Sequence, residues 1–237
     1  SDGWGTLAIM NDGYGLPADS QYISVLGGPH TASGGMEGKE LTNTFDNSMI
    51  YDTSKSRVGS FEWNPTSGST IEFWLKKSTF ITGSTEKEVI LDIWNGEASS
   101  SAGYGRIRLE LTGAANGVGP LRLTMVSGTT GFQLRDICPP TLTTASIADG
   151  QWHHYAVSFD SATDTIVDLY RDGTYLNTTT VSATNIGAIK NVAGGVNAYI
   201  GALQTSPSGS TGRPYSGKLS ASLDEFRYWK KKRTTNE

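Results

Sequence analysis

Short segments in which apolar and polar residues alternate constrain the fold of this chain more than any other feature of its sequence. Every second residue of Arg106–Thr112 is Ile or Leu, and the residues between them are charged or Thr. Ser69–Lys76 and Leu121–Met125 repeat the pattern. Successive side chains of a strand point to opposite faces, so this period of two predicts strands with one dry and one wet face. No long segment has a helical period, which favours an all-β fold.

The Asp-Gly pair at positions 172 and 173 marks the clearest hairpin. Both central residues of a two-residue type I′ turn have positive φ, and Asp-Gly is a preferred pair there. This turn places Tyr170 opposite Tyr175 and Leu169 opposite Leu176. A second short loop at Ser161–Asp164 precedes the same segment, so we expect three successive strands to form a meander.

The last predicted strand, Lys218–Trp229, contains a change of parity. Its apolar residues occupy one face up to Leu223 and the other face from Phe226 onward. A one-residue slip predicts a β-bulge near Asp224 and Glu225. We expect the bulge to turn Asp224 toward the core face, where its carboxylate must be hydrogen-bonded, with a ligand-binding role as the alternative.

Strands of this length and number pack best as two layers. The 237-residue chain has 29 glycines for its turns, and its one cysteine, Cys138, is expected to be a small buried residue. We therefore expect an antiparallel two-sheet jelly-roll sandwich over residues 42–237. Residues 1–41 are rich in glycine and contain only Gln21–Leu26 as a candidate strand, so we expect an extended N-terminal arm.

Charge and hydropathy exclude two classes of partner. The net charge is −4 and the pI is about 5.4, which argues against nucleic acid as a partner. No apolar run is long enough to span a bilayer, so no membrane partner is expected. We interpret the basic run Lys230–Arg233 as a solvated terminus that hinders edge-to-edge pairing. The chain does not begin with Met, so we expect it to be part of a longer or processed protein.

Several segments together resemble the laminin-G-like jelly-roll domain of the concanavalin-A-like lectin and glucanase superfamily. They appear in that family's order, and the resemblance covers residues 45–237: Ser69–Lys76, Asp149–Val157, Tyr170–Gly173, Ala198–Gly201, Tyr215–Leu219, Leu223–Trp229 and Arg233–Thr234. The resemblance implies two curved antiparallel sheets that bind sugars, proteins or lipids, sometimes through calcium at the rim. With its glycine-rich arm and single cysteine, the chain is similar to the members found in tailed-phage virion proteins.

The superfamily's jelly-roll glucanases carry carboxylates in an E-x-D-x-x-E pattern on one strand. The nearest segment here is Glu88–Glu97, in which Glu88 and Asp92 share a face but lie about 13 Å apart along a strand. Retaining hydrolysis needs carboxyl groups about 5–5.5 Å apart. We therefore predict no catalytic residues and no enzymatic activity.

The same segment supplies the candidate ligand-binding residues. Trp94, Asn95 and Glu97 end a strand and enter a Gly/Ser loop that also carries Tyr104. Aromatic rings stack on sugar rings, and amide and carboxylate groups bond to hydroxyls. The alternative is that Trp94 and Tyr104 cap the edge of the core.

Metal ligands are sparse. Calcium takes six to eight oxygens, and Asp160, Asp164 and Asp168 do not form an EF-hand loop. We expect no cofactor, with calcium held by distant rim loops as the alternative. His153 and His154 are adjacent and so point to opposite faces of a strand, which argues against a zinc pair.

These observations favour a non-enzymatic structural or decoration module of a larger assembly, in a bacteriophage virion, with glycan-binding capacity. Its partners would be neighbouring subunits, contacted through the arm at 1–41, and glycans. The alternative is a lectin-like adhesion module of a bacterial surface protein, located outside the cell or on its surface. A polysaccharide-cleaving enzyme is the third hypothesis.

Overall fold

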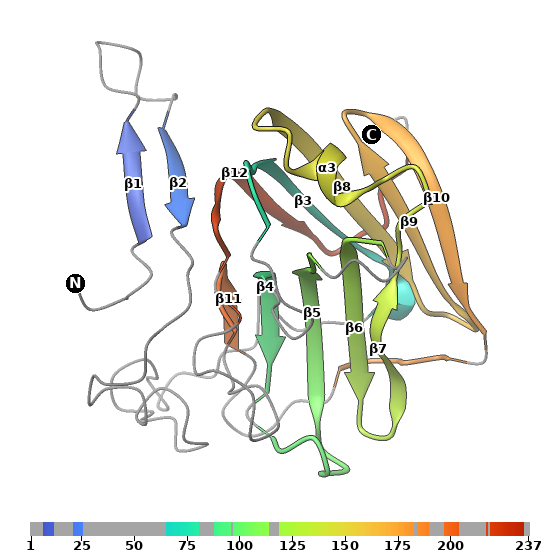
Figure 1. The fold of residues 1–237 in the computed structure, drawn as a ribbon. Coiled ribbons are helices and arrows are strands. Elements are labelled where there is room, and N and C mark those ends of the chain that lie inside the picture. The colour runs from blue at the N-terminus through green and yellow to red at the C-terminus, as the bar shows by residue number, and fades with distance from the viewer. Residues whose placement is uncertain are drawn as a thin grey trace, which may run out of the picture.

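Two antiparallel sheets pack face to face in the computed structural model (Figure 1). The structure describes residues 7–11, 21–25, 65–80, 88–95, 97–113, 119–182, 184–189, 197–203, 217 and 219–234. This architecture confirms the predicted two-sheet sandwich.

The larger sheet has seven strands, which lie in the order β1 (Leu7–Asn11), β2 (Gln21–Val25), β12 (Ala221–Trp229), β3 (Ser69–Lys76), β8 (Trp152–Asp160), β9 (Thr165–Arg171) and β10 (Thr174–Val181). The smaller sheet has five, in the order β11 (Asn197–Ile200), β4 (Glu88–Trp94), β5 (Gly105–Leu111), β6 (Leu121–Ser127) and β7 (Thr130–Asp136). The described helices are η2 (Pro65–Ser67) and α3 (Thr144–Ile147). The sequence predicted no helix, and α3 is one turn closed by a Thr143 capping box.

The core lies between the sheets and consists of the inward parity of both. Phe73 of β3, Phe159 of β8 and Leu109 of β5 are each at most 1 % exposed. Burying one such side chain stabilises the fold by about 1.5–3 kcal/mol, so the alternation seen in the sequence sets which face of each strand turns inward.

The polar face of β5, in the smaller sheet, is buried and not solvated as the sequence predicted. Every residue of β5 is buried, including Arg106, Arg108 and Glu110, which were expected to be solvated. Arg106 donates to Asp92 at 2.8 and 2.6 Å, and Arg108 pairs with Glu110. The alternation identified the two faces correctly, but it could not show that the polar face is also covered. Buried charges of this kind persist because they are paired.

The hairpin of β9 and β10 has the predicted turn. Asp172 and Gly173 have φ values of 52° and 74°, and Tyr170 pairs with Tyr175. The register then shifts, so that Asn177 and not Leu176 lies opposite Leu169. The predicted Leu169–Leu176 pair is therefore wrong, because a bulge at Leu176 interrupts the ladder beyond the turn.

The predicted bulge in β12 is confirmed, but its effect on Asp224 is not. The register against β3 shifts between Asp224 and Arg227, and Glu225 has a φ of 44°. Asp224 lies opposite Trp74, on the outer face, and its Oδ1 accepts a hydrogen bond from the Glu225 backbone N–H at 2.7 Å. The slip occurs after Asp224 and not before it, so its carboxylate stabilises the bulge instead of facing the core.

The N-terminal residues contribute two strands to the larger sheet. The expected strand at Gln21–Leu26 is present as β2, and β1 was not expected. β2 pairs with β12, with Val25 opposite Ala221 and Ile23 opposite Leu223. The predicted boundary between residues 41 and 42 lies outside the described residues.

Candidate functional site

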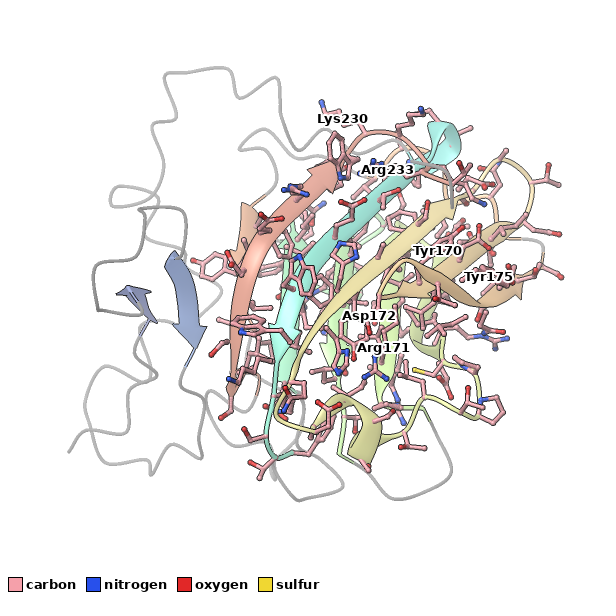
Figure 2. The ribbon with its side chains drawn as sticks, turned by 90° about the horizontal axis from the view of Figure 1, so that it is seen from above. Tyr170, Arg171, Asp172, Tyr175, Lys230 and Arg233 are labelled. Atoms are coloured by element: carbon pink, nitrogen blue, oxygen red, sulfur yellow. The ribbon has the colours of Figure 1, made fainter. Side chains whose placement is uncertain are left out.

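A hollow of about 270 Å³ lies on the outer face of the seven-stranded sheet, the face that Figure 2 views from above. It is lined by Thr70, Glu72, His154, Ala156, Ser158, Tyr170, Gly173, Arg227, Arg233 and Thr234. These residues come from four neighbouring strands, from the hairpin turn and from the chain after β12.

Small side chains in the middle of the sheet produce the hollow. Strand register places Arg227, Glu72, Ala156, Tyr170 and Tyr175 in one row across β12, β3, β8, β9 and β10. Ala156 stands at the centre of this row between larger neighbours. Because the central strand presents a methyl group where its neighbours present longer side chains, a hollow forms above Ala156, which is itself 9 % exposed.

Two of the residues that line the hollow, His154 and Tyr170, carry rings, and each ring lies against a further aromatic ring. On one side the Trp74 and His154 rings lie 5.5 Å apart, and at the β9–β10 end the Tyr170 and Tyr175 rings meet edge to face at 5.7 Å. Tyr175 is 47 % exposed and Trp229, beyond Thr70, is 38 % exposed. Exposed aromatic surface around a concave floor is typical of binding sites for small ligands.

The chain after β12 folds back onto this face. The Arg233 backbone N–H donates to Thr70 Oγ1 at 2.9 Å and to Ser158 Oγ at 3.1 Å. The Arg233 guanidinium donates to Glu72 at 2.7 Å and stacks 4.5 Å above the Trp229 ring centre. Arg233 and Thr234 therefore form one wall of the hollow.

Lys232 secures the same segment at its other side. Its Nζ pairs with Asp160 at 2.7 Å and with Asp168 at 2.9 Å. Burial disfavours the charged amine, but these two hydrogen-bonded carboxylates outweigh it and raise the pKa of Lys232. The interpretation of Lys230–Arg233 as a solvated terminus is thus wrong for its last two residues, which the sheet's own carboxylates hold in place.

The residues that the sequence singled out lie elsewhere, on the smaller sheet. Trp94, Asn95 and Tyr104 are 3–5 % exposed, and Trp94 and Tyr104 pack together with Val126. The Trp94 indole donates to the Glu97 carbonyl at 2.8 Å, and the Asn95 amide donates to the Gly103 carbonyl at 2.7 Å. These contacts fit the alternative in which the two rings cap the core edge. Sugar binding by Trp94, Asn95, Glu97 and Tyr104 stays a prediction.

The acidic residues of β4 each face a cation. Glu88 pairs with Lys77 at 2.5 Å, and Asp92 is held by Arg106. Burial lowers the pKa of Lys77, and the adjacent Glu88 works against that shift. Both carboxylates therefore neutralise buried cations in the structure.

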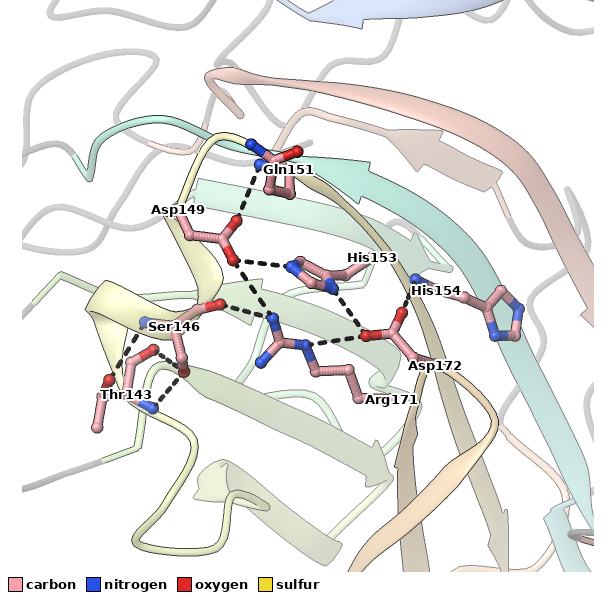
Figure 3. Close-up of polar contacts among 8 residues, drawn as sticks. All are labelled: Thr143, Ser146, Asp149, Gln151, His153, His154, Arg171 and Asp172. Carbon is pink, nitrogen blue, oxygen red and sulfur yellow. Dashed lines mark hydrogen bonds and ion pairs between the residues drawn. The ribbon is translucent and has the colours of Figure 1, made fainter.

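A cluster of polar side chains ties α3 to the β9–β10 turn (Figure 3). His153 lies between Asp149 at 2.9 Å and Asp172 at 2.7 Å, while His154 points to the other face of β8. Arg171 donates to the Ser146 carbonyl at 2.9 Å. The prediction that the two histidines diverge is confirmed, and His153 stabilises the turn.

Cys138 is partly buried, and its thiol donates to the Leu121 carbonyl at 3.6 Å. Burial raises the pKa of the Cys138 thiol to about 12, so the unreactive thiol form predominates. Among the residues that the structure describes, no three His, Cys, Asp or Glu side chains gather as metal ligands would. Within the same residues, no helix is long and apolar enough to cross a membrane.

Sequence comparison shows the family to which these features belong. Residues 51–237 match the Laminin_G_3 family model, described as the concanavalin A-like lectin/glucanases superfamily. The chain therefore belongs to this superfamily. No curated protein sequence matches the chain.

Several solved structures are similar to this chain at low sequence identity. The binding domain of paraclostridial mosquitocidal protein 1 is similar with a TM-score of 0.50 and 14 % identity, over 97 % of this chain and 44 % of that one. Domains LG4-5 of the mouse laminin α1 chain give 0.43 and 14 %, over 76 % and 39 %. The Ruminococcus gnavus IT-sialidase CBM40 bound to α2,3-sialyllactose gives 0.44 and 16 %, over 72 % and 80 %. The chain thus spans less than half of the first two.

Sequence reasoning missed the hollow although it singled out the segments that build it. Three segments that carry the family resemblance also supply outward residues to the hollow: Ser69–Lys76, Asp149–Val157 and Leu223–Trp229. The available signal was Ala156, a small residue on the polar parity of a strand whose neighbours on that parity include His154. Only the cross-strand register shows that this methyl group lies between Glu72 and Tyr170.

Proposed function

We propose that this chain is a non-catalytic, lectin-like domain that binds glycans in the hollow on the outer face of its seven-stranded sheet. The observation that carries the proposal is the hollow over Ala156, which the rings of Tyr170 and His154 help to line. A sugar ring is flat enough to lie in such a hollow, with its apolar face against an aromatic ring and its hydroxyls toward polar groups.

The charges of the site support binding without hydrolysis. Glycoside hydrolysis uses a pair of carboxyl groups on either side of the scissile bond. Among the residues that line the hollow, Glu72 is the only carboxylate, and Arg233 binds it. On β4, Lys77 and Arg106 bind the carboxylates of Glu88 and Asp92, so they do not form an acid–base pair either.

A glycan array tests this function by comparing the wild-type chain with a variant in which a larger side chain fills the hollow. Ala156→Leu adds an apolar side chain at the centre of the floor, and we expect it to abolish the glycan signal of the wild-type chain. Thr180→Leu, at an exposed position of β10 that does not line the hollow, is the matched control and should retain binding. Equal melting temperatures would show that both variants fold. A blank array for the wild-type chain, or full binding by Ala156→Leu, contradicts the proposal.

The glycan-binding role implies a position outside the cell or on a surface, where polysaccharides are met. The narrower assignment to a phage virion, with residues 1–41 contacting neighbouring subunits, rests on the glycine-rich segment and on the resemblance. Negative-stain imaging of particles labelled through this chain tests it. Labelled virions would support it, and label confined to a cell envelope would favour the surface-adhesion alternative.

A further inference from the structure

The two arginines that line the hollow have different ion-pair partners. Arg227 and Arg233 face one carboxylate, Glu72, so the lining has one net positive charge although the whole chain carries −4. Glu72 is 6 % exposed and is bound by Arg233. Arg227 lies directly opposite Glu72 in the register, but its ion pair is with Glu225 instead.

The Arg227–Glu225 pair is open to exchange. Both side chains are 50 % exposed, and the Arg227 Nη2 lies 2.8 Å from the Glu225 Oε2. Exposed ion pairs contribute little to stability, because water solvates each partner nearly as well. A carboxylate that arrives in the hollow can therefore take the place of Glu225 at little cost to the fold.

The bulge places Glu225 where it competes with such a ligand. Glu225 has a φ of 44°, in the left-handed region that residues other than glycine rarely adopt. Its backbone N–H donates a hydrogen bond to the Asp224 carboxylate. The Glu225 carboxylate thus stands beside the guanidinium at the rim of the hollow. A guanidinium binds a carboxylate best through two parallel hydrogen bonds, whereas Glu225 makes one.

We propose that the hollow selects acidic glycans, whose sugar carboxylate binds Arg227 and displaces Glu225. This inference rests on the proposed function and names its ligand class. Arg227 provides the positive charge, and Tyr170 and His154 border the sugar ring. Glu225 lowers the affinity for the ligand, because its ion pair with Arg227 must break before the sugar carboxylate can bind there.

The test uses paired probes on the full chain: oligogalacturonate with its methyl ester, oligoglucuronate with its carboxyl-reduced form, and sialyllactose with lactose. For the acidic member of the best-bound pair, Arg227→Gln should weaken binding at least about tenfold. Glu225→Gln should strengthen it about two- to fivefold. Neither change should alter binding of the neutral member. Arg135→Gln, on the exposed edge strand β7, removes the same charge elsewhere and should have no effect.

Two results overturn the inference. One is that the wild-type chain binds no acidic probe more tightly than its neutral counterpart. The other is that Glu225→Gln weakens acidic binding or leaves it unchanged. If acidic and neutral probes bind equally and Ala156→Leu abolishes both, the hollow binds glycans but the acid selectivity is wrong. If no glycan binds at all, the proposed function fails as well.

Discussion

Single side chains decide how the β9–β10 turn is held against the rest of the domain. Asp149 accepts a hydrogen bond from the Gln151 backbone N–H at 2.9 Å and another from His153. The Gln151 amide, followed by the His153 contact, lowers the pKa of the Asp149 carboxyl. A carboxylate whose pKa is lower in the folded state stabilises the fold once it is ionised.

Asp149→Asn should therefore destabilise the domain in a pH-dependent way. Above the ordinary aspartate pKa of about 3.9, we expect a loss of no more than about 1 kcal/mol, because water screens this partly exposed group. The difference between wild type and variant should shrink as the pH falls through the lowered folded-state pKa, where Asp149 becomes protonated. Urea unfolding at a series of pH values measures this. A difference that grows on acidification contradicts the account.

At the scale of elements, the chain after β12 is positioned by a close approach to η2. Gly68, at the end of η2, has a φ of 83°, and a Cβ added there would lie 2.6 Å from the Lys232 Cβ and 2.8 Å from its backbone nitrogen. Two constraints require glycine at this position: the positive φ of the backbone and the close approach of Lys232. The wall of the hollow formed by Arg233 and Thr234 depends on this glycine, because these two residues follow Lys232 in the chain.

Gly68→Ala and Gly150→Ala separate these two requirements. Gly150 also has positive φ, at 78°, but nothing lies within 4 Å of its added Cβ. We expect Gly150→Ala to cost about 1–2 kcal/mol from the backbone angle alone. Gly68→Ala should cost about 1–3 kcal/mol more through the clash with Lys232. It should also weaken glycan binding, because Arg233 moves with Lys232. Equal losses of stability in denaturant unfolding would show that the contact is unimportant.

The elements were also where sequence reasoning was most successful. The Asp-Gly pair predicted the turn at 172–173, and the parity change predicted the bulge in β12, because both signals depend only on neighbouring residues. The shift at Leu176 and the outward direction of Asp224 were missed. A bulge can sit at any of two or three adjacent positions with the same parity pattern, and the partner strand selects among them.

For the whole molecule, we expect the folded state not to depend on calcium. The carboxylates of Asp160 and Asp168, two of the candidate calcium ligands, bind Lys232. Thermal melting with millimolar calcium or with chelator should give the same midpoint, since only a ligand that prefers the folded state raises it. A rise in calcium that chelator reverses would instead favour the rim-calcium alternative.

The sequence by itself determined that the chain forms strands, which face of each strand turns inward, where its tightest turn lies and which superfamily it resembles. These properties depend on the period-two pattern and on residues close together in the chain. The tertiary structure alone decided where a ligand fits. Arg227, Glu72, Ala156 and Tyr170 are far apart in the sequence and meet only through the register of four strands. It also decided that Arg106 and Glu110 are buried, because the pattern marks a polar face without showing what covers it.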